Sequence, residues 1–353
     1  MKVGFLSIEK QTVDRREAQI ALFDCGNSGE IFLTVSDEAD IEWAVSQLRT
    51  VCDLIVVEGN TALFYNAYQD RLPSSPEHFE LDGKLYSVTP SANKEYVENK
   101  LIPLINSKNK RAMYEVAVFK TYGKSVDELK AILKDFIKSR SKIQFGFFPQ
   151  HLECEIHARC SANMKKITLN EISEKLNELL YNFTYSYERV SIAERVAELL
   201  VRHGLKLKIA ESFTGGALAQ AFTSLAGASG YLTEGLVTYS NDAKINRLGV
   251  PREVIAEKGA VSSDVAYNMA AGLIASGDCD ISVSTTGNAG PTAAGGAVGL
   301  CYIAIGDARE VHIVKYNFGG DRENNIESGV KNALFLLYEY LVCYGAKPTQ
   351  PQG

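Results

Sequence analysis

The first hundred residues alternate short apolar runs with amphipathic stretches, which is the pattern of a layered α/β domain. The apolar runs have the length of strands, and they are separated by helical stretches such as DIEWAVSQLRTV (residues 40–51) and NKEYVENKLIPLIN (93–106). Apolar runs of four to eight residues between helical segments are typical of buried strands. We therefore predict an α/β domain over residues 1–106, with a polar linker, INSKNKR, at 105–111.

Residues 112–186 follow a different order of elements. Their apolar positions predict strand, helix, strand, strand and helix, in a unit too small to repeat the first pattern. One of these strands, HLECEIHARC (151–160), alternates polar and apolar residues, which we interpret as a strand with one exposed face. Its two histidines and two cysteines lack the ligand spacing of a zinc site, so we expect no metal there. This segment is predicted to be a small α+β domain.

A third segment begins with the amphipathic helix VSIAERVAELLVRHG (190–204), for which Gly204 is a natural stop. From Leu205 the composition shifts to Ala, Gly, Ser and Thr, and strands again alternate with helices. We predict a second layered α/β domain over residues 190–345. The fold class is therefore α/β, with three domains.

Length, charge and cysteine content narrow the class of protein. A chain of 353 residues exceeds what one core usually holds. Its 37 basic and 43 acidic side chains leave a net charge of −6 without a basic block, so we expect no nucleic-acid partner. No apolar run is long enough to span a bilayer and the start becomes charged too soon for a signal peptide, so we expect a cytoplasmic protein without a membrane partner. The seven cysteines show no CxxC pair, which favours reduced thiols, and a homodimer is the expected assembly.

The segment LKLKIAESFTGGALAQAF carries the first candidate chemistry. A probable strand runs into a probable helix, with Ser212, Thr214, Gly215 and Gly216 at the junction. Backbone N–H groups and the positive end of a helix point outward together in such a turn, which suits an oxyanion or a phosphate. Taken alone, the pattern is explained better by Ser212 as an N-cap and by glycines that make a tight turn.

A second segment, EGLVTYSNDAKINRLGV, brings Tyr239 and Lys244 to the end of another predicted strand. A serine hydroxyl is a weak nucleophile until a base takes its proton, and a desolvated lysine can be that base. The five histidines have no evident relation to Ser212, which argues against a Ser-His-Asp triad. Separately, each residue also has a structural interpretation, Tyr239 as a sheet aromatic and Lys244 as a solvated helix lysine.

A third strand, DISVSTTG, ends in a loop of small residues that includes Thr286, Gly287, Asn288 and Gly290. Loops of this composition often bind phosphates or riboses, although one such loop is weak evidence. Arg322, in the later GGDR segment, is the cation we expect to assist a phosphate there. Its alternative is a surface arginine near a helix start.

Together the motifs AESFTGG, VTYSNDAK and STTGNAGP resemble the CinA C-terminal family, from about Val190 to Leu341. The resemblance also covers GAVSSDVAYNMAAGL and FGGDRENNIESGVKNAL. It implies a nicotinamide-nucleotide amidase that converts nicotinamide mononucleotide and water to nicotinate mononucleotide and ammonia, without a cofactor. By motif, Ser212 corresponds to the nucleophile, Lys244 to its base and Tyr239 to the third catalytic group. The amides near Thr214 to Gly216 would then stabilise the oxyanion.

Three departures from the family pattern lie close to this site. Phe213 stands where the family generally has cysteine, Asn288 replaces an aliphatic residue, and the loop after Pro291 is short. The Ser212 and Lys244 pair is unaffected by them. They do call into question the shape of the nucleotide pocket.

The front half resembles the remainder of full-length CinA, whose first domain is similar to molybdopterin-binding proteins and is associated with ADP-ribose pyrophosphatase activity. Here LSIEKQTVD replaces the acidic GDE-type turn, and NTALFYNAY replaces GGxGPTxDD. Because those groups would hold the pyrophosphate and its metal, residues 1–106 resemble a truncated, degenerate domain of this kind. Residues 112–186 resemble the family's KH-like domain but lack the GXXG loop that clamps nucleic acid.

Three functions follow from these observations. The leading one is an active amidase on a small nucleotide, with the front domains setting the oligomeric state. The second is a non-catalytic scaffold or regulatory protein. The third is a residual pyrophosphatase in the first domain, the only one of the three that would require a divalent metal.

Overall fold

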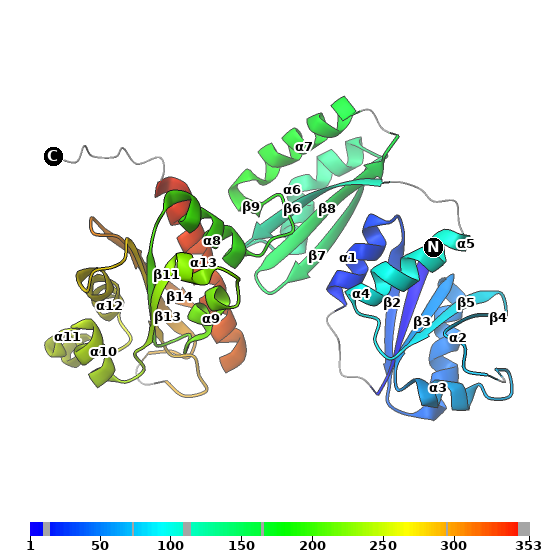
Figure 1. The fold of residues 1–353 in the computed structure, drawn as a ribbon, viewed down its shortest axis with the longest axis horizontal. Coiled ribbons are helices and arrows are strands. Elements are labelled where there is room, and N and C mark those ends of the chain that lie inside the picture. Colours follow the sequence, from blue (N-terminus) through cyan, green and yellow to red (C-terminus); the bar gives the residue numbers. More distant parts are fainter. Residues whose placement is uncertain (10–14, 73, 109–113, 164–165, 294–295, 345–353) are drawn as a thin grey trace. The chain divides into compact units, whose positions relative to one another are not determined.

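The computed structural model describes the chain except for residues 10–14, 73, 109–113, 164–165, 294–295 and 345–353 (Figure 1). It is a mixed α/β protein with three sheets, which confirms the α/β class. The chain divides into two compact units, one formed by residues 1–119, 125–150 and 154–182, the other by residues 120–124, 151–153 and 183–353. The division into three domains stays a prediction. Among the described residues, no helix is both long and apolar enough to cross a membrane.

The first unit contains a five-stranded sheet of order β2-β1-β3-β5-β4, parallel except for the β4–β5 hairpin. Apolar side chains on its two faces form separate cores with the flanking helices. The elements are β1 (Lys2–Ile8), α1 (Arg16–Asp24), β2 (Ser28–Val35), η1 (Glu38–Asp40), α2 (Ile41–Val51), β3 (Leu54–Gly59), α3 (Thr61–Ala67), β4 (His78–Leu81), β5 (Lys84–Thr89), α4 (Lys94–Tyr96), η2 (Val97–Leu101) and α5 (Ile102–Lys108).

A four-stranded sheet of order β7-β8-β6-β9 follows, and its core includes side chains of two helices. The predicted strand, helix, strand, strand and helix are all present, with one short strand added. The elements are β6 (Tyr114–Tyr122), α6 (Val126–Ser139), β7 (Gln144–Gln150), β8 (Glu153–Ser161), α7 (Lys166–Leu180), η3 (Tyr181–Phe183) and β9 (Thr184–Ser186).

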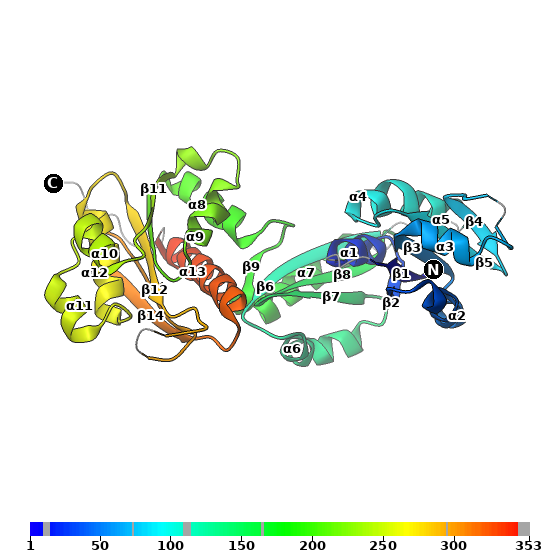
Figure 2. The ribbon, with the colours of Figure 1, turned by 90° about the horizontal axis from the view of Figure 1, so that it is seen from below.

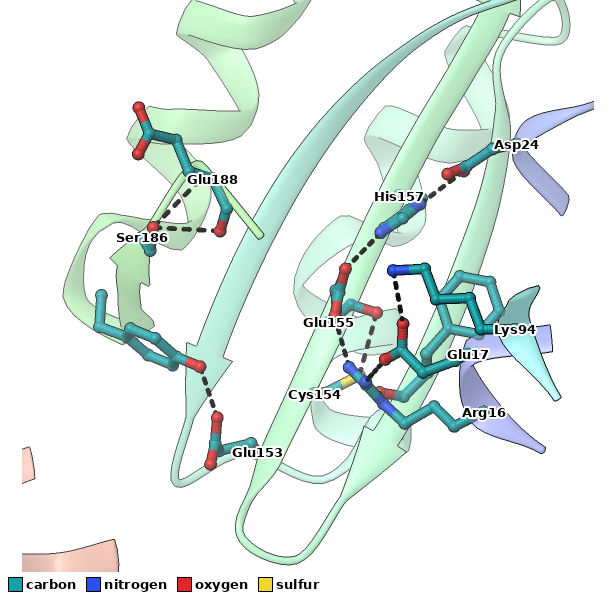
Figure 3. A network of polar contacts seen from close by, with 12 residues as sticks. Arg16, Glu17, Asp24, Lys94, Glu153, Cys154, Glu155, His157, Ser186 and Glu188 are labelled. Carbon is teal, nitrogen blue, oxygen red and sulfur yellow. Dashed lines mark hydrogen bonds and ion pairs between the residues drawn. The ribbon is translucent and has the colours of Figure 1, made fainter. Parts of the chain in front are cut away.

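The expectation that one face of β8 is exposed is wrong, because every residue from Glu153 to Cys160 is buried. His157 is the clearest case, with 0% of its surface exposed. Its Nδ1 lies 2.6 Å from Asp24 Oδ1 and its Nε2 lies 2.7 Å from Glu155 Oε1 (Figure 3). The polar face of β8 is therefore covered, and the charges of Glu155 and His157 are paired within the first unit.

Both ring nitrogens of His157 face carboxylates, so only the protonated imidazolium can donate a hydrogen bond to each. Burial by itself lowers the pKa of His157. The hydrogen bonds and charges of Asp24 and Glu155 outweigh burial, so the pKa is raised above 6.5. This histidine is a structural cation.

The second unit contains a five-stranded sheet of order β11-β10-β12-β13-β14. The pairs β10–β11 and β10–β12 are parallel, whereas β12–β13 and β13–β14 are antiparallel. Helices α8, α9 and α13 cover one face, and α10, α11 and α12 lie on the other (Figures 1 and 2). The elements are α8 (Ile192–His203), β10 (Leu207–Glu211), α9 (Ala217–Thr223), η4 (Ala228–Gly230), β11 (Leu232–Val237), α10 (Asn241–Leu248), α11 (Arg252–Lys258), α12 (Ser263–Ala275), β12 (Ile281–Gly287), β13 (Leu300–Gly306), β14 (Val311–Asn317) and α13 (Arg322–Tyr344).

Local signals explain where the first helix of this sheet begins and ends. Ser191 and Glu194 form a reciprocal capping box at the start of α8. Gly204 adopts φ 66° directly after the helix, a left-handed conformation that glycine takes without strain. The predicted helix and its glycine stop are confirmed.

Candidate active site

The three sequence motifs meet at one edge of the second unit's sheet. Ser212 follows β10, Tyr239 follows β11 and Asn288 follows β12, so all three lie at the carboxyl ends of adjacent parallel strands. Ligands of open α/β sheets bind outside these ends. A cavity of about 290 Å³ opens here, and its lining residues are Ser212, Phe213, Tyr239, Asn241, Lys244, Ala260, Val261, Thr286, Gly287, Asn288, Ala289, Gly290, Thr292 and Arg322.

Lys244 and Ser212 are in direct contact. Lys244 Nζ donates to Ser212 Oγ over 2.9 Å and also to the carbonyl oxygens of Thr238 (2.9 Å) and Tyr239 (3.3 Å). The lysine is 1% exposed, and in the described part of the chain no carboxylate lies within ion-pair distance of it. Burial without a counterion disfavours the charged form and lowers the pKa of Lys244 to about 8. The pair has the geometry of a nucleophile and its base.

The first turn of α10 places this lysine. Ser240 caps the helix by accepting a hydrogen bond from the Ala243 amide. Lys244 lies one turn into the helix, and its side chain points back to the strand end at Thr238. The predicted base therefore reaches the predicted nucleophile from a neighbouring strand end.

The positive end of α9 is already occupied, contrary to the prediction that it faces a bound anion. Glu211, fully buried at the end of β10, accepts hydrogen bonds from the amides of Gly216 (2.8 Å), Leu218 (3.0 Å) and Ala219 (2.8 Å). The carboxylate thus satisfies the unpaired N–H groups of this short helix. Sequence reasoning assigned this residue no role, although a lone glutamate ending a buried strand was a usable signal.

Contacts of this kind also reduce the number of backbone amides that could donate to an oxyanion. The amides of Ser212 and Phe213 donate to the Thr285 carbonyl, over 2.9 and 3.3 Å, and the Gly216 amide is held by Glu211. Of the predicted donors, the amides of Thr214 and Gly215 form no hydrogen bond within the described residues. Thr214, Gly215 and Gly216 do not line the cavity.

Among the described residues, the Tyr239 hydroxyl forms no hydrogen bond with Ser212 or Lys244. The side chain is 63% exposed, and its hydroxyl accepts a hydrogen bond from Arg322 Nη2 over 3.3 Å. Only its backbone carbonyl contacts Lys244. The side chain lies at the rim of the cavity, whereas the resemblance implies a role in the chemistry.

The predicted phosphate loop and Arg322 lie together at the cavity. Arg322 Nη1 donates to the Gly290 carbonyl over 2.7 Å, and no carboxylate among the described residues pairs with it. The Thr286 hydroxyl, however, donates to the Ala260 carbonyl. Within the described part of the chain, Arg322 therefore brings a positive charge without a carboxylate partner to the cavity. The Thr286 hydroxyl already donates its proton to the backbone.

Hydrogen bonds join the two ends of the connection that contains Asn288 and the short loop after Pro291. The Asn288 amide donates to the Leu300 carbonyl over 2.8 Å, and the Gly299 amide donates to the Asn288 carbonyl over 2.7 Å. These bonds close the β12–β13 connection at its base. Part of the loop, residues 294–295, lies outside the described residues.

Six cavity-lining residues were not among the predicted site residues. They are Phe213, Asn241, Ala260, Val261, Ala289 and Thr292. Asn241 lies one residue after the helix cap, and Ala260 and Val261 belong to the GAVSSD segment, whose place at the cavity follows from tertiary packing. Only the family resemblance had included that segment.

In the front unit, Glu58 at the end of β3 is the acidic group that a metal site would use. It is buried, accepts a hydrogen bond from Ser7 Oγ over 2.7 Å and one from the Ala92 amide over 3.0 Å. Arg15 Nη2 lies 3.2 Å from its carboxylate. This carboxylate is bound to the protein's own donors.

Comparison with known proteins agrees with the motifs. The CinA C-terminal domain family matches residues 189–341. A relative from Caldicellulosiruptor saccharolyticus, whose name refers to competence-damage induction, is 32% identical over 75% of this chain and 66% of its own length. A CinA-like protein from Geotalea daltonii is 34% identical over 69% of this chain and 60% of its own length. The chain thus spans just under two thirds of the length of these relatives.

Among solved structures, a CinA superfamily protein from Klebsiella pneumoniae is 33% identical, with a TM-score of 0.42. The match covers 43% of this chain and 96% of the other. The predicted family is confirmed by the domain match and by the curated relatives. This chain belongs to the CinA family.

Proposed function

We propose that the second unit is an amidohydrolase that hydrolyses the carboxamide of nicotinamide mononucleotide to nicotinate mononucleotide and ammonia. The observation that carries the proposal is the 2.9 Å contact between Ser212 Oγ and a buried lysine whose pKa is lowered to about 8. A lysine with this pKa is partly neutral near pH 7 to 8, so it can accept the serine proton. The substrate itself is taken from the family resemblance.

In the first half of the reaction, Ser212 Oγ attacks the carboxamide carbon while neutral Lys244 takes the hydroxyl proton. Of the oxyanion donors that the resemblance implies, the amides of Thr214 and Gly215 are those without a hydrogen bond in the described part of the chain, although neither residue lines the cavity. The Lys244 ammonium then gives its proton to the amide nitrogen as the C–N bond breaks. Ammonia leaves, and the acyl group stays on Ser212 as an ester.

In the second half, Lys244 takes a proton from water as the water oxygen attacks the ester carbon. The ester C–O bond breaks, and Lys244 returns the proton to Ser212 Oγ. Nicotinate mononucleotide leaves as the carboxylate. The same lysine acts as base and acid in each half, which requires only one titratable side chain at the reacting centre.

Recognition of the nucleotide would use the unpaired charge at the cavity wall. The Arg322 guanidinium, fixed by Gly290 and Tyr239, offers the planar donor set that phosphate oxygens accept. It lines the same cavity as the nucleophile. We therefore assign the phosphate to Arg322 and the carboxamide to Ser212.

The test is ammonia release from nicotinamide mononucleotide by the full chain, with a chelator present throughout. We expect turnover in the parent protein and its loss in Ser212→Ala, because no nucleophile remains. Ser224→Ala, an exposed serine at the end of α9, is the matched control and should keep full activity.

Two results would contradict the proposal. A folded parent protein that releases no ammonia would favour the scaffold function or another amide. Ammonia release that disappears with the chelator would contradict a mechanism that uses only Ser212 and Lys244, because it would require a divalent metal.

A further inference from the structure

Phe213, which directly follows the proposed nucleophile, is a large and tightly packed side chain at a position where the family generally has cysteine. Phe213 is 2% exposed and lies in the loop between β10 and α9. Its ring faces the Phe318 ring, with centroids 6.0 Å apart. The ring also lines the cavity. A large aromatic side chain thus occupies the position directly beside Ser212.

Two glycines from different elements make room for this ring. A Cβ atom added at Gly287, the last residue of β12, would lie 2.5 Å from Phe213 Cδ2. A Cβ atom added at Gly329, inside α13, would lie 2.7 Å from Cε1 and 2.8 Å from Cδ1. Carbon atoms do not approach this closely, so the ring is confined by backbone on two sides.

The backbone of the same loop is fixed on one acceptor. The amides of Ser212 and Phe213 both donate to the Thr285 carbonyl. The loop is therefore held by two hydrogen bonds from its backbone amides at the strand end and by one ring that is fixed in the core. Because Ser212 is covalently adjacent to this ring, a displacement of the ring moves the serine against Lys244.

We propose that Phe213 is a positioning residue for the nucleophile: its ring, confined between Gly287 and Gly329, fixes Ser212 Oγ at hydrogen-bond distance from Lys244. This inference rests on the proposed function, because it assumes that Ser212 is the nucleophile. It adds that α13, through Gly329, takes part in aligning the reacting pair.

Gly329→Ala is the decisive substitution. Its nearest neighbours are the Phe213 ring and Thr214 Cγ2 at 3.3 Å, so the added methyl acts on the nucleophile loop and not on distant backbone. Alanine is also the better helix former, so weaker α13 helicity would not explain a loss. Gly287 is less suitable, because its added Cβ would also meet the Leu300 carbonyl oxygen at 2.3 Å.

The primary readout is the rate at which phenylmethylsulfonyl fluoride modifies Ser212, followed by intact mass. In this reaction the Oγ–S bond forms, the S–F bond breaks, and Lys244 takes the hydroxyl proton. The rate reports the alignment of Ser212 and Lys244 without any assumption about the natural amide. Ammonia release from nicotinamide mononucleotide is measured beside it, as kcat and KM.

We expect Gly329→Ala to slow modification of Ser212 at least about tenfold and to lower kcat more than KM changes, because misplacement by a fraction of an ångström weakens the reacting geometry. In the double variant Phe213→Leu/Gly329→Ala, the smaller side chain leaves space for the methyl. Its modification rate should recover to near that of Phe213→Leu alone. Gly230→Ala, which meets no atom within 4 Å, is the matched control.

Each other result overturns the inference. An unchanged rate in Gly329→Ala would show that the ring does not set the serine, and a double variant as slow as Gly329→Ala would show that the methyl acts elsewhere. A melting temperature for each variant separates misalignment from unfolding, and the recovered double variant remains informative if Gly329→Ala is unstable. If Ser212 of the parent protein is not modified, Ser212 and Lys244 are not aligned as a reactive pair, and the inference is wrong.

The two proposals fail separately. If the parent is modified at Ser212 but releases no ammonia, the choice of substrate is wrong, and the rates in the variants still test the role of Phe213.

Discussion

Lys244 and His157 are both buried bases, but their surroundings shift their pKa values in opposite directions. Lys244 contacts only a hydroxyl and two carbonyl oxygens, and its pKa falls to about 8. His157 lies between the carboxylates of Asp24 and Glu155, and its pKa rises. A buried base with a counterion keeps its proton and joins two elements, whereas one without a counterion is ready to exchange it.

The comparison shows that a buried basic side chain can have either of two roles in one chain, to hold elements together or to exchange a proton. The network around His157 connects α1 to β8 inside the first unit (Figure 3). The contacts of Lys244 connect α10 to the nucleophile. The sign of the pKa shift therefore distinguishes the candidate catalytic base Lys244 from the buried His157.

The largest expected effect follows from removing the unpaired base. Lys244→Met keeps the length of the side chain but has no proton acceptor, and we expect kcat for ammonia release to fall by about 10²–10⁴. Lys208→Met is the matched control, because Lys208 is equally buried but is paired with Glu234 at 3.3 Å. Equal losses in the two variants would mean that burial of any lysine, and not its protonation, supports activity.

The next effect concerns the paired base. His157→Leu leaves Asp24 and Glu155 without the cation between them, so we expect a destabilisation of about 3 kcal/mol in the first unit. The stabilisation by His157 is fully present below pH 6.5 and is lost as the pH rises through the raised pKa of the folded protein. Hydrogen exchange of α1 and β8 at pH 6 and at higher pH measures both effects.

His312→Gln, at an exposed histidine of the other unit, should leave this exchange unchanged. A His157→Leu protein with the parent's exchange at pH 6 would contradict the assignment of His157 as a structural cation.

The smallest effect sharpens the comparison by giving Lys244 a counterion. Activity should rise with pH through about 8, because only the neutral lysine accepts the serine proton. Asn241 lines the cavity and lies three residues before Lys244 on α10. In Asn241→Asp the added carboxylate favours the charged lysine, so the rising limb of the pH–rate profile should move to higher pH and lower kcat at pH 7 about tenfold.

A pH–rate profile that is identical in the parent and in Asn241→Asp would show that a group other than Lys244 controls the rate. Asn241→Ser, which adds no charge, controls for the loss of the amide.

The sequence brought Ser212 and Lys244 together because strand ends are local signals, and the family resemblance supplied their expected roles. Ser212 and Lys244 each follow an apolar run that ends in small or turn-forming residues, and parallel strands bring such ends to one edge. The direction of side chains beyond the strand ends was not predictable in this way. The Tyr239 hydroxyl reaches Arg322, which is supplied by a helix more than eighty residues later.

Burial of polar groups was the other limit of the sequence. The alternation in β8 indicated an exposed face, but α1, from the start of the chain, contributes the Asp24 partner that allows His157 to be buried. Likewise, Glu211 filled the end of α9 that the glycine-rich turn alone had left open. In both places a distant or back-folded carboxylate decided the outcome, and periodicity carries no information about such pairings.

The closed base of the β12–β13 connection has a consequence for how this protein can diverge. Since the bonds between Asn288, Gly299 and Leu300 fix both ends of the loop, residues can be inserted or deleted between them without a change of register in the sheet. Part of the cavity wall belongs to this loop, whereas Ser212 and Lys244 belong to other strand ends. For the proposed amidohydrolase, changes in loop length can therefore alter the substrate preference while Ser212 and Lys244 keep their positions.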